Sequence, residues 1–359
     1  MVNAKRIMVA MSGGVDSSVT AALCLRQGFE VIGVTMRLYS HENPTIKGKT
    51  CCAGKDIYDA EKVARSLNIP HYVMDYEDTF LKEVIESFKS AYLQGETPNP
   101  CIECNRTVKF RDLLKLAQDL GACGLATGHY VQGKDGALGP ELHTGIDPSK
   151  DQSYFLFATR PEQLARLHFP LGGLSKSETR EIAAQLGLNV ANKPESQDIC
   201  FVPSGKYSDL LADNARPGKI VTSQGKVLGQ HKGIANFTVG QRKGLGIAAP
   251  QPLFVLRLDV ENNQVIVGYK AELGQESLVI RDVNWLGPDN LRNHDGINLR
   301  VKLRSTRPAA AAKLYWLENN QAKIILDIPD EAVAPGQACV FYNGTQVWGG
   351  GWICKPENK

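Results

Sequence analysis

Hydrophobic positions in the first third of the chain form short runs that alternate with amphipathic stretches. Apolar runs at 6–11, 30–36 and 71–75 have the length of buried strands, while residues 16–27 and 56–69 carry apolar positions at helical spacing. Buried strands that alternate with helices are typical of parallel β/α/β units. We therefore expect an α/β domain on a doubly wound parallel sheet, with its ligands beyond the carboxyl ends of the strands.

The pattern changes further along the chain. Helical spacing continues at about 78–93 and at 108–121, and a strand is expected at 123–130, before a mainly helical and irregular stretch. From about residue 215, short alternating strands with frequent glycine are typical of small antiparallel barrels. We predict three domains: an α/β domain with a helical insertion at 1–210, a small β-rich central domain at 211–275, and a C-terminal antiparallel β-barrel at 276–359.

The composition is that of a globular protein with an ample core, since 43% of the residues are hydrophobic and 22% are charged. No apolar run approaches the roughly 20 residues that span a bilayer, and the opening residues do not resemble a secretion signal. Nine cysteines at irregular spacing then favour reduced thiols over a disulfide framework. We expect a cytoplasmic protein without membrane attachment.

The net charge of +3 is unevenly distributed. Residues 211–359 hold 18 Lys and Arg against 13 Asp and Glu, whereas the first 210 residues hold 23 against 25. Within the second half, residues 216–243 and 300–313 contain basic residues and no acidic ones. Such clusters either favour a polyanionic partner, such as a nucleic acid, or form a solvated basic face.

A Ser-Gly-rich turn, MSGGVDSS at Met11–Ser18, lies between the first expected strand and the first expected helix. Its glycines let backbone N–H groups approach an anion, and the helix N-terminus adds a favourable partial charge. It is not a dinucleotide fingerprint, and the GKT triplet at 48–50 lacks the glycine that a Walker A loop requires. The position favours a phosphate-binding loop over a simple tight turn.

The stretch TPNPCIECNRTVKF at 97–110 places two cysteines three residues apart, just ahead of the expected helix. Such a pair can belong to a zinc site, a redox pair, an iron–sulfur cluster or a catalytic thiol site. A structural zinc site commonly uses a second C-x-x-C pair, which the sequence lacks, and a thioredoxin-like pair would directly follow an early strand. The remaining cysteines divide into four expected in the core and an adjacent pair expected in a polar loop: Cys24, Cys123, Cys339 and Cys354, and then Cys51 and Cys52.

The loop motif SGGVDS resembles the pyrophosphatase loop of enzymes that adenylate a substrate with ATP. The stretches TPNPCIECNRTVKF, ATGHY, KDQSYFLF, ESQDICF and FTVGQRKGLG follow it in order. Together they resemble the tRNA-specific 2-thiouridylases from Met8 to about Trp352. The resemblance implies a tRNA-uridine 2-sulfurtransferase that replaces the C2 oxygen of the anticodon wobble uridine with sulfur.

The same resemblance implies an adenine nucleotide alpha-hydrolase-like fold and an ATP site. The loop would hold the pyrophosphate end of ATP, Met36 would lie by the adenine, and Gly128 would line the same pocket. Magnesium is expected because ATP is used. The residues implied at the nucleotide are Ala10, Met11, Ser12, Gly13, Gly14, Val15, Asp16, Ser17, Met36 and Gly128.

The resemblance also assigns roles to two cysteines. Adenylation turns the C2 oxygen into a good leaving group, after which a persulfide on Cys200 would deliver sulfur and Cys104 would act as the thiol nucleophile. The two would close a disulfide once the sulfur has left, although they lie 96 residues apart in the sequence. A free thiol has a pKa of about 8.5, which nearby cations such as Arg106 or Lys109 would lower.

One position departs from the family pattern. Cys101 stands where better-known members have an Asp to which acid/base work is attributed, so that assignment does not carry over. As an alternative, Cys101, Cys104 and Cys200 would be three ligands of a [4Fe–4S] cluster that carries the sulfur.

The resemblance further implies contacts with tRNA, including a pocket for a flipped-out wobble base. The expected substrates are the wobble-uridine tRNAs for Lys, Glu and Gln, and a cysteine desulfurase or a sulfur-relay protein would supply the sulfur. The residues implied at the tRNA are Thr97, Asn99, His129, Lys150, Asp151, Gln152, Arg304, Ser305 and Gln337.

Two other functions are open to the sequence. An ATP-pyrophosphatase ligase or amidotransferase would use the same loop, but it needs neither a cysteine pair spread across the chain nor a basic barrel. A non-catalytic RNA-binding protein would keep the nucleotide fold without turnover. Release of pyrophosphate that depends on tRNA distinguishes an enzyme from the second of these.

Overall fold

A computed structural model describes residues 5–39, 52–195, 199–202, 210–211, 216–292, 294, 296–331 and 333–356. The chain forms two compact units, each assembled from separate segments. Unit 1 contains Met1–Val84, Cys101–Gly205 and Gly344–Val347, and unit 2 contains Ile85–Pro100, Lys206–Asn343 and Trp348–Lys359. Within the described residues, no helix is long and apolar enough to cross a membrane.

Unit 1 is built on a parallel sheet with the strand order β3-β2-β1-β4-β7. Its strands are β1 (Arg6–Ala10), β2 (Glu30–Arg37), β3 (His71–Asp75), β4 (Leu125–Ala126) and β7 (Leu167–His168). Chain order reverses between β1 and β4, which makes the carboxyl ends of these two strands the usual ligand position of such a sheet.

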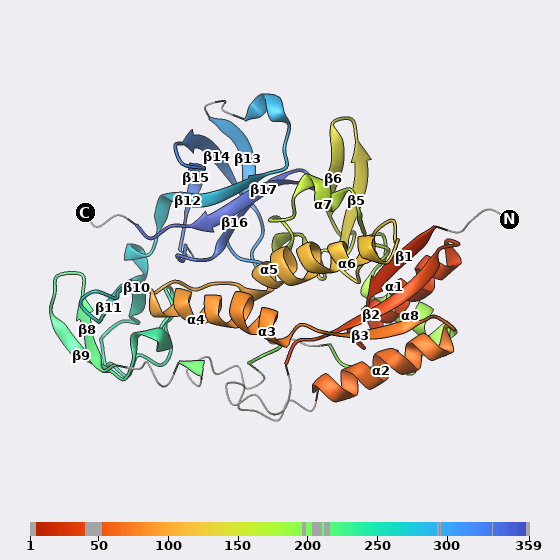
Figure 1. Ribbon diagram of the computed structural model, residues 1–359. Coiled ribbons are helices and arrows are strands. Elements are labelled where there is room, and N and C mark those ends of the chain that lie inside the picture. The colour runs from red at the N-terminus through yellow and green to blue at the C-terminus, as the bar shows by residue number, and fades with distance from the viewer. Residues whose placement is uncertain are drawn as a thin grey trace. The chain divides into compact units, whose positions relative to one another are not determined.

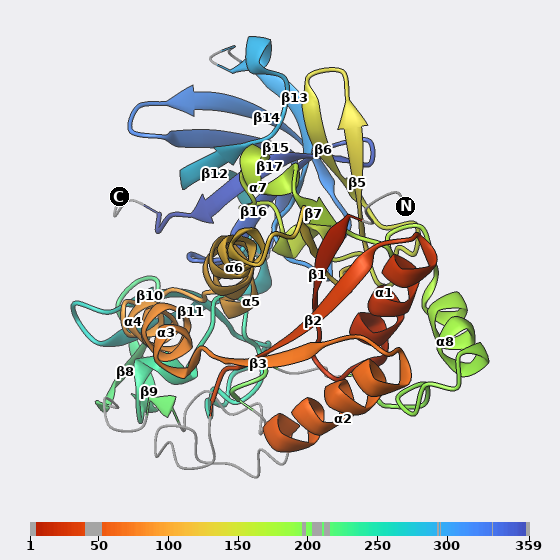
Figure 2. The ribbon, with the colours of Figure 1, turned by 45° about the vertical axis from the view of Figure 1, so that its right-hand side comes forward.

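Helices cover both faces of this sheet (Figures 1 and 2). One face carries α1 (Val15–Arg26), α2 (Cys52–Ser66) and α8 (Lys176–Gln185), and the other carries α6 (Leu114–Asp119). Fully buried side chains from strands and helices form the core of the first face, among them Ile7, Val9, Val19, Cys24 and Ala60. The predicted doubly wound α/β domain is therefore confirmed.

The helix after the TPNP stretch begins earlier than the sequence suggests. It starts as α5 (Pro100–Cys104), passes through the π-helix η2 (Asn105–Leu113) and continues as α6. Proline is favoured in the first turn of a helix because it has no N–H to leave unsatisfied. The CIEC motif therefore lies inside the helix rather than ahead of it, next to a π-helical segment of the kind often found at functional sites.

Several features of unit 1 differ from the sequence prediction. The strand expected at 123–130 is only two residues long, because the chain leaves the sheet after Ala126 to form the TGHY stretch. Cys123, expected in the core, precedes this short strand and is exposed. A hairpin that the sequence did not predict follows, with the strands β5 (Val131–Gly136) and β6 (Gly139–Thr144). The remaining short helices of this unit are α3 (Glu77–Phe80), η1 (Leu81–Ile85, which ends in unit 2), η3 (Ser153–Phe155) and α7 (Pro161–Leu164).

Unit 2 contains α4 (Glu86–Leu93) and a small four-stranded sheet with the order β10-β11-β8-β9. The strands are β8 (Gly218–Thr222), β9 (Val227–His231), β10 (Phe254–Asp259) and β11 (Gln264–Gly268). Buried side chains of this sheet and its neighbouring loops form their own core, among them Ile220, Phe237, Val255, Val265 and Val267. Three short 3-10 helices also belong to unit 2: η6 (Ile234–Asn236), η7 (Lys270–Glu272) and η8 (Asp289–Leu291).

The C-terminal part of unit 2 is a closed antiparallel barrel, as predicted. Strand pairing runs β12-β15-β14-β13-β16-β17 and returns from β17 to β12. The strands are β12 (Gln275–Trp285), β13 (Ile297–Lys302), β14 (Ala310–Leu317), β15 (Gln321–Asp330), β16 (Ala338–Asn343) and β17 (Gln346–Ile353), the first two residues of which belong to unit 1. Cys339 is fully buried in the barrel core as expected, whereas Cys354 is only half-buried, so its core prediction was wrong.

Candidate functional site

The phosphate-loop candidate connects β1 to α1. The backbone N–H of Ser12 donates to Oγ of Ser17 at 3.1 Å, and Oγ of Ser18 donates to the carbonyl of Gly14 at 2.8 Å. Gly13 has φ +72°, and a Cβ there would lie 2.1 Å from the carbonyl oxygen of Asp56, so only glycine fits. Gly14 caps α1 without a side-chain hydrogen bond from the described residues, and this start of α1 suits an anion.

Gly128 lies directly against this loop. A Cβ at Gly128 would lie 3.0 Å from both the carbonyl carbon of Asp16 and the nitrogen of Ser17. The end of β4 and the loop after β1 are therefore in contact at the switch point of the sheet. Met36 lies near the end of β2, in register with Met74 of β3, and is half-buried.

The carboxylate of Asp16 is held by two side chains that sequence reasoning missed. The hydroxyl of Tyr130 donates to Oδ1 at 2.7 Å, and Nζ of Lys176 donates to Oδ1 and Oδ2 at 2.7 and 2.9 Å. A capping box between Ser175 and Glu178 fixes the start of α8 and so positions Lys176 at its first residue. The sequence SKSE carried that capping signal, but nothing local connected it with the loop.

The fold brings the cysteines of the thiol prediction into electrostatic contact. Cys104 is buried, whereas Cys101 and Cys200 retain exposed surface. Burial, with smaller contributions from the nearby Cys104 and Cys101, raises the pKa of the Cys200 thiol to about 12. Cys104 and Cys200 are not bonded to each other in this structure, but the sequence gap of 96 residues between them is closed by the fold. Cys51 lies outside the described residues.

Lys109 is the cation of this cluster. Burial raises the pKa of Cys104, and the charge of Lys109 opposes that rise. The same charge lowers the pKa of Cys101 and Cys200 against the larger effect of burial. Arg106, the other cation considered from the sequence, pairs instead with Glu103 at 2.6 Å.

His129 lies near the same cation. Burial lowers the pKa of its imidazole well below the usual range, and Lys109 lowers it further, so the ring is neutral at pH 7. Its Nδ1 is hydrogen-bonded with Oγ1 of Thr127 at 2.9 Å, and the ring meets Phe110 edge to face with centroids 5.9 Å apart. These contacts hold the imidazole in one orientation.

The KDQ stretch of unit 1 is engaged within the protein. Nζ of Lys150 donates to Glu195 at 2.7 Å, and Oε1 of Gln152 accepts from the backbone N–H of Tyr130 at 3.0 Å. Asp151 accepts hydrogen bonds from the backbone and hydroxyl of Ser153 at 3.1 and 2.9 Å. The stretch therefore adjoins the ATGHY segment, and its role at tRNA stays a prediction.

The other predicted tRNA residues lie in unit 2. Thr97 is fixed by the barrel, since its N–H donates to the carbonyl of Pro335 at 2.7 Å and its carbonyl accepts from Nε2 of Gln337 at 2.6 Å. Arg304 donates to the carbonyl of Val239 at 3.2 Å. The half-buried residues Asn99 and Ser305 belong to the same unit.

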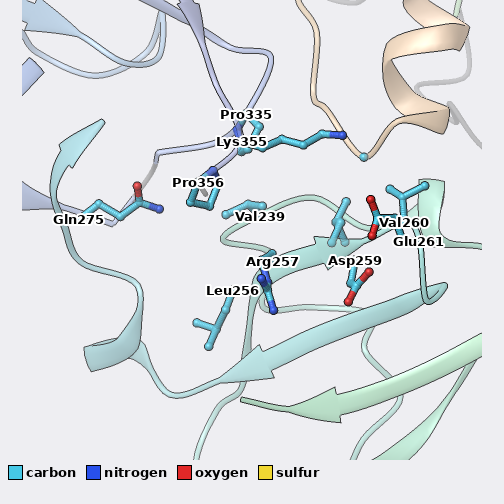
Figure 3. A pocket seen from close by; sticks show the side chains of 12 residues that line it. Val239, Leu256, Arg257, Asp259, Val260, Glu261, Gln275, Pro335, Lys355 and Pro356 are labelled. Carbon is cyan, nitrogen blue, oxygen red and sulfur yellow. The ribbon is translucent and has the colours of Figure 1, made fainter. Parts of the chain in front are cut away.

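Unit 2 also contains a cavity of about 240 Å³ beside β10 (Figure 3). Arg257, Asp259, Glu261 and Lys355 give its lining charges of both signs. Of the predicted site residues that the structure describes, none lines this cavity. It adjoins two of them, because the lining residues Pro335 and Val239 accept hydrogen bonds from Thr97 and Arg304.

Cys101, Cys104 and Cys200 were also predicted as possible ligands of an iron–sulfur cluster. Among the described residues, no three His, Cys, Asp or Glu side chains are grouped so as to hold a metal ion. The alternative in which Cys101, Cys104 and Cys200 ligate an iron–sulfur cluster therefore finds no matching ligand set in that part of the chain, and no step is derived through a cluster.

A nucleotide-type loop at the switch point of a parallel sheet, with interacting thiols in the same unit, defines a class of α/β enzymes that combine nucleotide chemistry with cysteine chemistry. Residues 5–204 match the family described as the tRNA methyl transferase HUP domain. Residues 210–269 match its PRC-barrel domain, and residues 275–353 match an aminomethyltransferase beta-barrel domain.

Full-length relatives identify the family. Proteins named tRNA-specific 2-thiouridylase MnmA from Rickettsia rickettsii and Rickettsia conorii are each 53% identical over 353 residues, covering 97% of this chain and 96% and 95% of theirs. The protein from Rickettsia felis is also 53% identical, over 354 residues, with coverage of 97% and 96%. The chain belongs to the tRNA-specific 2-thiouridylases, a family of enzymes.

Solved structures show more distant likeness. An ATP-bound complex of a 4-thiouridine synthetase with RNA has a TM-score of 0.38 and 18% identity, covering 57% of this chain and 47% of that one. An NMN synthetase from Francisella tularensis has a TM-score of 0.35 and 20% identity, covering 58% and 73%. Likenesses of this size carry no argument about the site.

Proposed function

We propose that the protein catalyses ATP-dependent 2-thiolation of the wobble uridine in tRNA, which yields 2-thiouridine, AMP and pyrophosphate. The observation that carries this proposal is that Cys104 lies near enough to Cys200 to raise its pKa, in the unit that also contains the phosphate loop. Relatives that are 53% identical are named tRNA-specific 2-thiouridylases. The matched domain descriptions refer to methyl transfer, but interacting thiols in the same unit as a nucleotide loop suit sulfur transfer better.

The first step is adenylation of the uracil. The C2 oxygen attacks the α-phosphorus of ATP, a new O–P bond forms, and the bond to pyrophosphate breaks. The backbone amides of the loop from Gly13 to Ser17 and the start of α1 hold the departing pyrophosphate, whose charge they complement. Magnesium accompanies the ATP as its counter-ion. Gly128 allows the end of β4 to close on the loop without displacing it.

The second step is sulfur transfer. The outer sulfur of a persulfide on Cys200 attacks C2, and AMP leaves with the oxygen that was adenylated. The Cys104 thiolate then attacks Sγ of Cys200, which breaks the persulfide S–S bond and leaves the outer sulfur on the base. The products are 2-thiouridine and a Cys104–Cys200 disulfide, which an external thiol reductant reopens. Lys109 favours the Cys104 thiolate, which burial disfavours.

Residues of each unit would contact the tRNA. In unit 1 these are neutral His129 and the stretch Lys150 to Gln152, and in unit 2 they are Thr97, Asn99, Arg304, Ser305 and Gln337. The expected substrates are the tRNAs for Lys, Glu and Gln, and a cysteine desulfurase or a relay protein would load Cys200. Unpaired bases held in a pocket suit this kind of recognition.

The test is a reconstituted reaction with a tRNA transcript, ATP, magnesium and a persulfide donor. AMP release and 2-thiouridine are measured for the wild type, Cys200→Ser and Cys104→Ser, with Cys123→Ser as a matched control at an exposed cysteine. We expect thiolation by the wild type and the control, and none by Cys200→Ser. Thiolation by Cys200→Ser at the wild-type rate would refute the persulfide assignment, and AMP formation that ignores tRNA would refute the reaction.

A further inference from the structure

The segment that leads into Cys200 is fastened to the phosphate loop by a hydrogen bond and to α2 by two ion pairs. Nζ of Lys193 donates to the carbonyl of Gly13 at 2.9 Å and to the carboxylates of Asp56 and Asp59 at 2.7 and 2.5 Å. Arg180 holds the same segment from α8, donating to the carbonyls of Ala191 and Lys193 at 2.6 and 3.2 Å.

Glu195 makes the second connection, two residues further along. Its carboxylate lies 2.7 Å from Nζ of Lys150 and 3.1 Å from Nζ of Lys176. Lys176 also binds Asp16 of the phosphate loop. One carboxylate therefore joins the nucleotide loop, through Lys176, to the first residue of the KDQ stretch.

We propose that Glu195 is a positioning residue that holds the Cys200 segment in register with the phosphate loop, so that sulfur is delivered before the adenylate is lost to water. This proposal rests on the proposed function, because it assumes that Cys200 carries the sulfur.

Glu195 and Cys200 are five residues apart, so the ion pairs of Glu195, which we call the tether, act close to Cys200 along the chain. Five residues span at most about 18 Å when fully extended, so the position of Glu195 limits where the Cys200 sulfur can lie. The interactions are only partly screened, since the Lys176 side chain is 11% exposed and that of Glu195 is 29% exposed. A hydrogen bond from Lys150 and then one from Lys176 lower the pKa of Glu195, so the carboxylate is charged at neutral pH.

The ion pairs of Lys176 link the tether to the loop where ATP would bind. The ammonium of Lys176 pairs with the carboxylates of both Asp16 and Glu195. Bound ATP would add negative charge beside Asp16. Lys176, which donates to both oxygens of Asp16, is a cation placed to interact with that charge. Glu195, which anchors the Cys200 segment, is therefore linked through Lys176 to the loop where ATP would bind for the adenylation step.

Loss of the Glu195 contacts should therefore affect sulfur transfer but not adenylation. An adenylate that sulfur does not reach is hydrolysed: water attacks C2, AMP leaves, and uridine is regenerated. A loosened Cys200 segment would leave adenylation intact and raise this unproductive loss. A merely structural ion pair would lower both products together, through the amount of folded protein.

The experiment compares Glu195→Gln with Glu195→Asp, which keeps the charge, and with the exposed control Glu162→Gln. Protein loaded with persulfide is mixed with tRNA transcript, ATP and magnesium, and AMP and 2-thiouridine are quantified in a single turnover. Removing a charge-assisted contact predicts about a tenfold fall in 2-thiouridine per AMP for Glu195→Gln. AMP formation should stay close to the wild-type rate, and Glu195→Asp should recover much of the ratio.

An unchanged ratio of 2-thiouridine to AMP in Glu195→Gln would overturn the inference, whether or not both products fall. Equal behaviour of Glu195→Gln and Glu162→Gln would overturn it as well. Different results refute what the inference rests on: thiolation by Cys200→Ser at the wild-type rate refutes the persulfide assignment, and AMP formation that ignores tRNA refutes the reaction. The failures are therefore distinguishable.

Discussion

Replacing Gly128 with alanine probes the contact between the end of β4 and the phosphate loop. A Cβ there would lie 3.0 Å from the carbonyl carbon of Asp16 and from the nitrogen of Ser17, and 3.1 Å from Cβ of Asp16. The optimal separation of carbon atoms is about 3.5–4.0 Å, so the loop backbone must retreat by a few tenths of an ångström. Gly128 does not have a positive φ, so the substitution tests the contact without backbone strain.

The magnitude follows from the cost of overpacking. Inserting a methyl group into a close contact costs about 1–3 kcal/mol, and about 1.4 kcal/mol corresponds to a tenfold change in affinity. The displaced atoms are the backbone that would bind the pyrophosphate of ATP, so a shift there weakens several amide contacts at once. We expect ATP affinity to fall about tenfold, with the rest of the cost appearing as lower thermal stability.

Calorimetric titration with a non-hydrolysable ATP analogue measures the affinity directly. Gly173→Ala is the matched control, because Gly173 is exposed and a Cβ there would have no other side chain or distant backbone atom within 4 Å. The reasoning is refuted if Gly128→Ala binds the analogue as tightly as Gly173→Ala does.

Three further changes test other parts of the site. Lys109→Met should move the pH dependence of single-turnover thiolation to higher pH, because Lys109 opposes the rise that burial causes in the pKa of Cys104 and the thiolate is the reactive form; Lys109→Arg should not. Cys101→Ser should retain most of the thiolation activity, because neither step of the proposed reaction uses Cys101, and a complete loss in the same assay would give Cys101 a role in the reaction. Arg281→Met should lower the free energy of unfolding by about 2 kcal/mol, measured with urea, because Glu96 loses its 3.0 Å partner while its side chain is only 10% exposed.

The parts of the fold with strong local signals were predictable. The strands at 6–10 and 30–37 each contain a short apolar run, at 7–10 and 31–34, and the glycines of the loop mark the turn between the first strand and α1. The hairpin of β5 and β6 was not predictable in this way, since each strand buries only one residue, Val131 and Leu142. Without alternation of buried and exposed positions, a strand resembles a loop.

The site residues were likewise predictable only where they belong to a local motif. Motifs such as SGGVDS identify the loop because its chemistry depends on adjacent residues. The pairing of Asp16 with Lys176 joins positions 160 residues apart, and only the fold reveals it. Cys123 illustrates the opposite error, because an apolar neighbourhood in the sequence suggested burial, whereas the residue lies before a two-residue strand and is exposed.

The most direct measurement is single-turnover thiolation of a tRNA transcript by iron-free protein supplied with ATP, magnesium and a persulfide donor. Sulfur delivery from Cys200 with Cys104 as the thiol nucleophile predicts that chelator-treated protein forms one 2-thiouridine for each AMP released. It also predicts a Cys104–Cys200 disulfide afterwards, detectable by peptide mass spectrometry. Absence of product until an iron–sulfur cluster is rebuilt would contradict this account and make the cysteines cluster ligands.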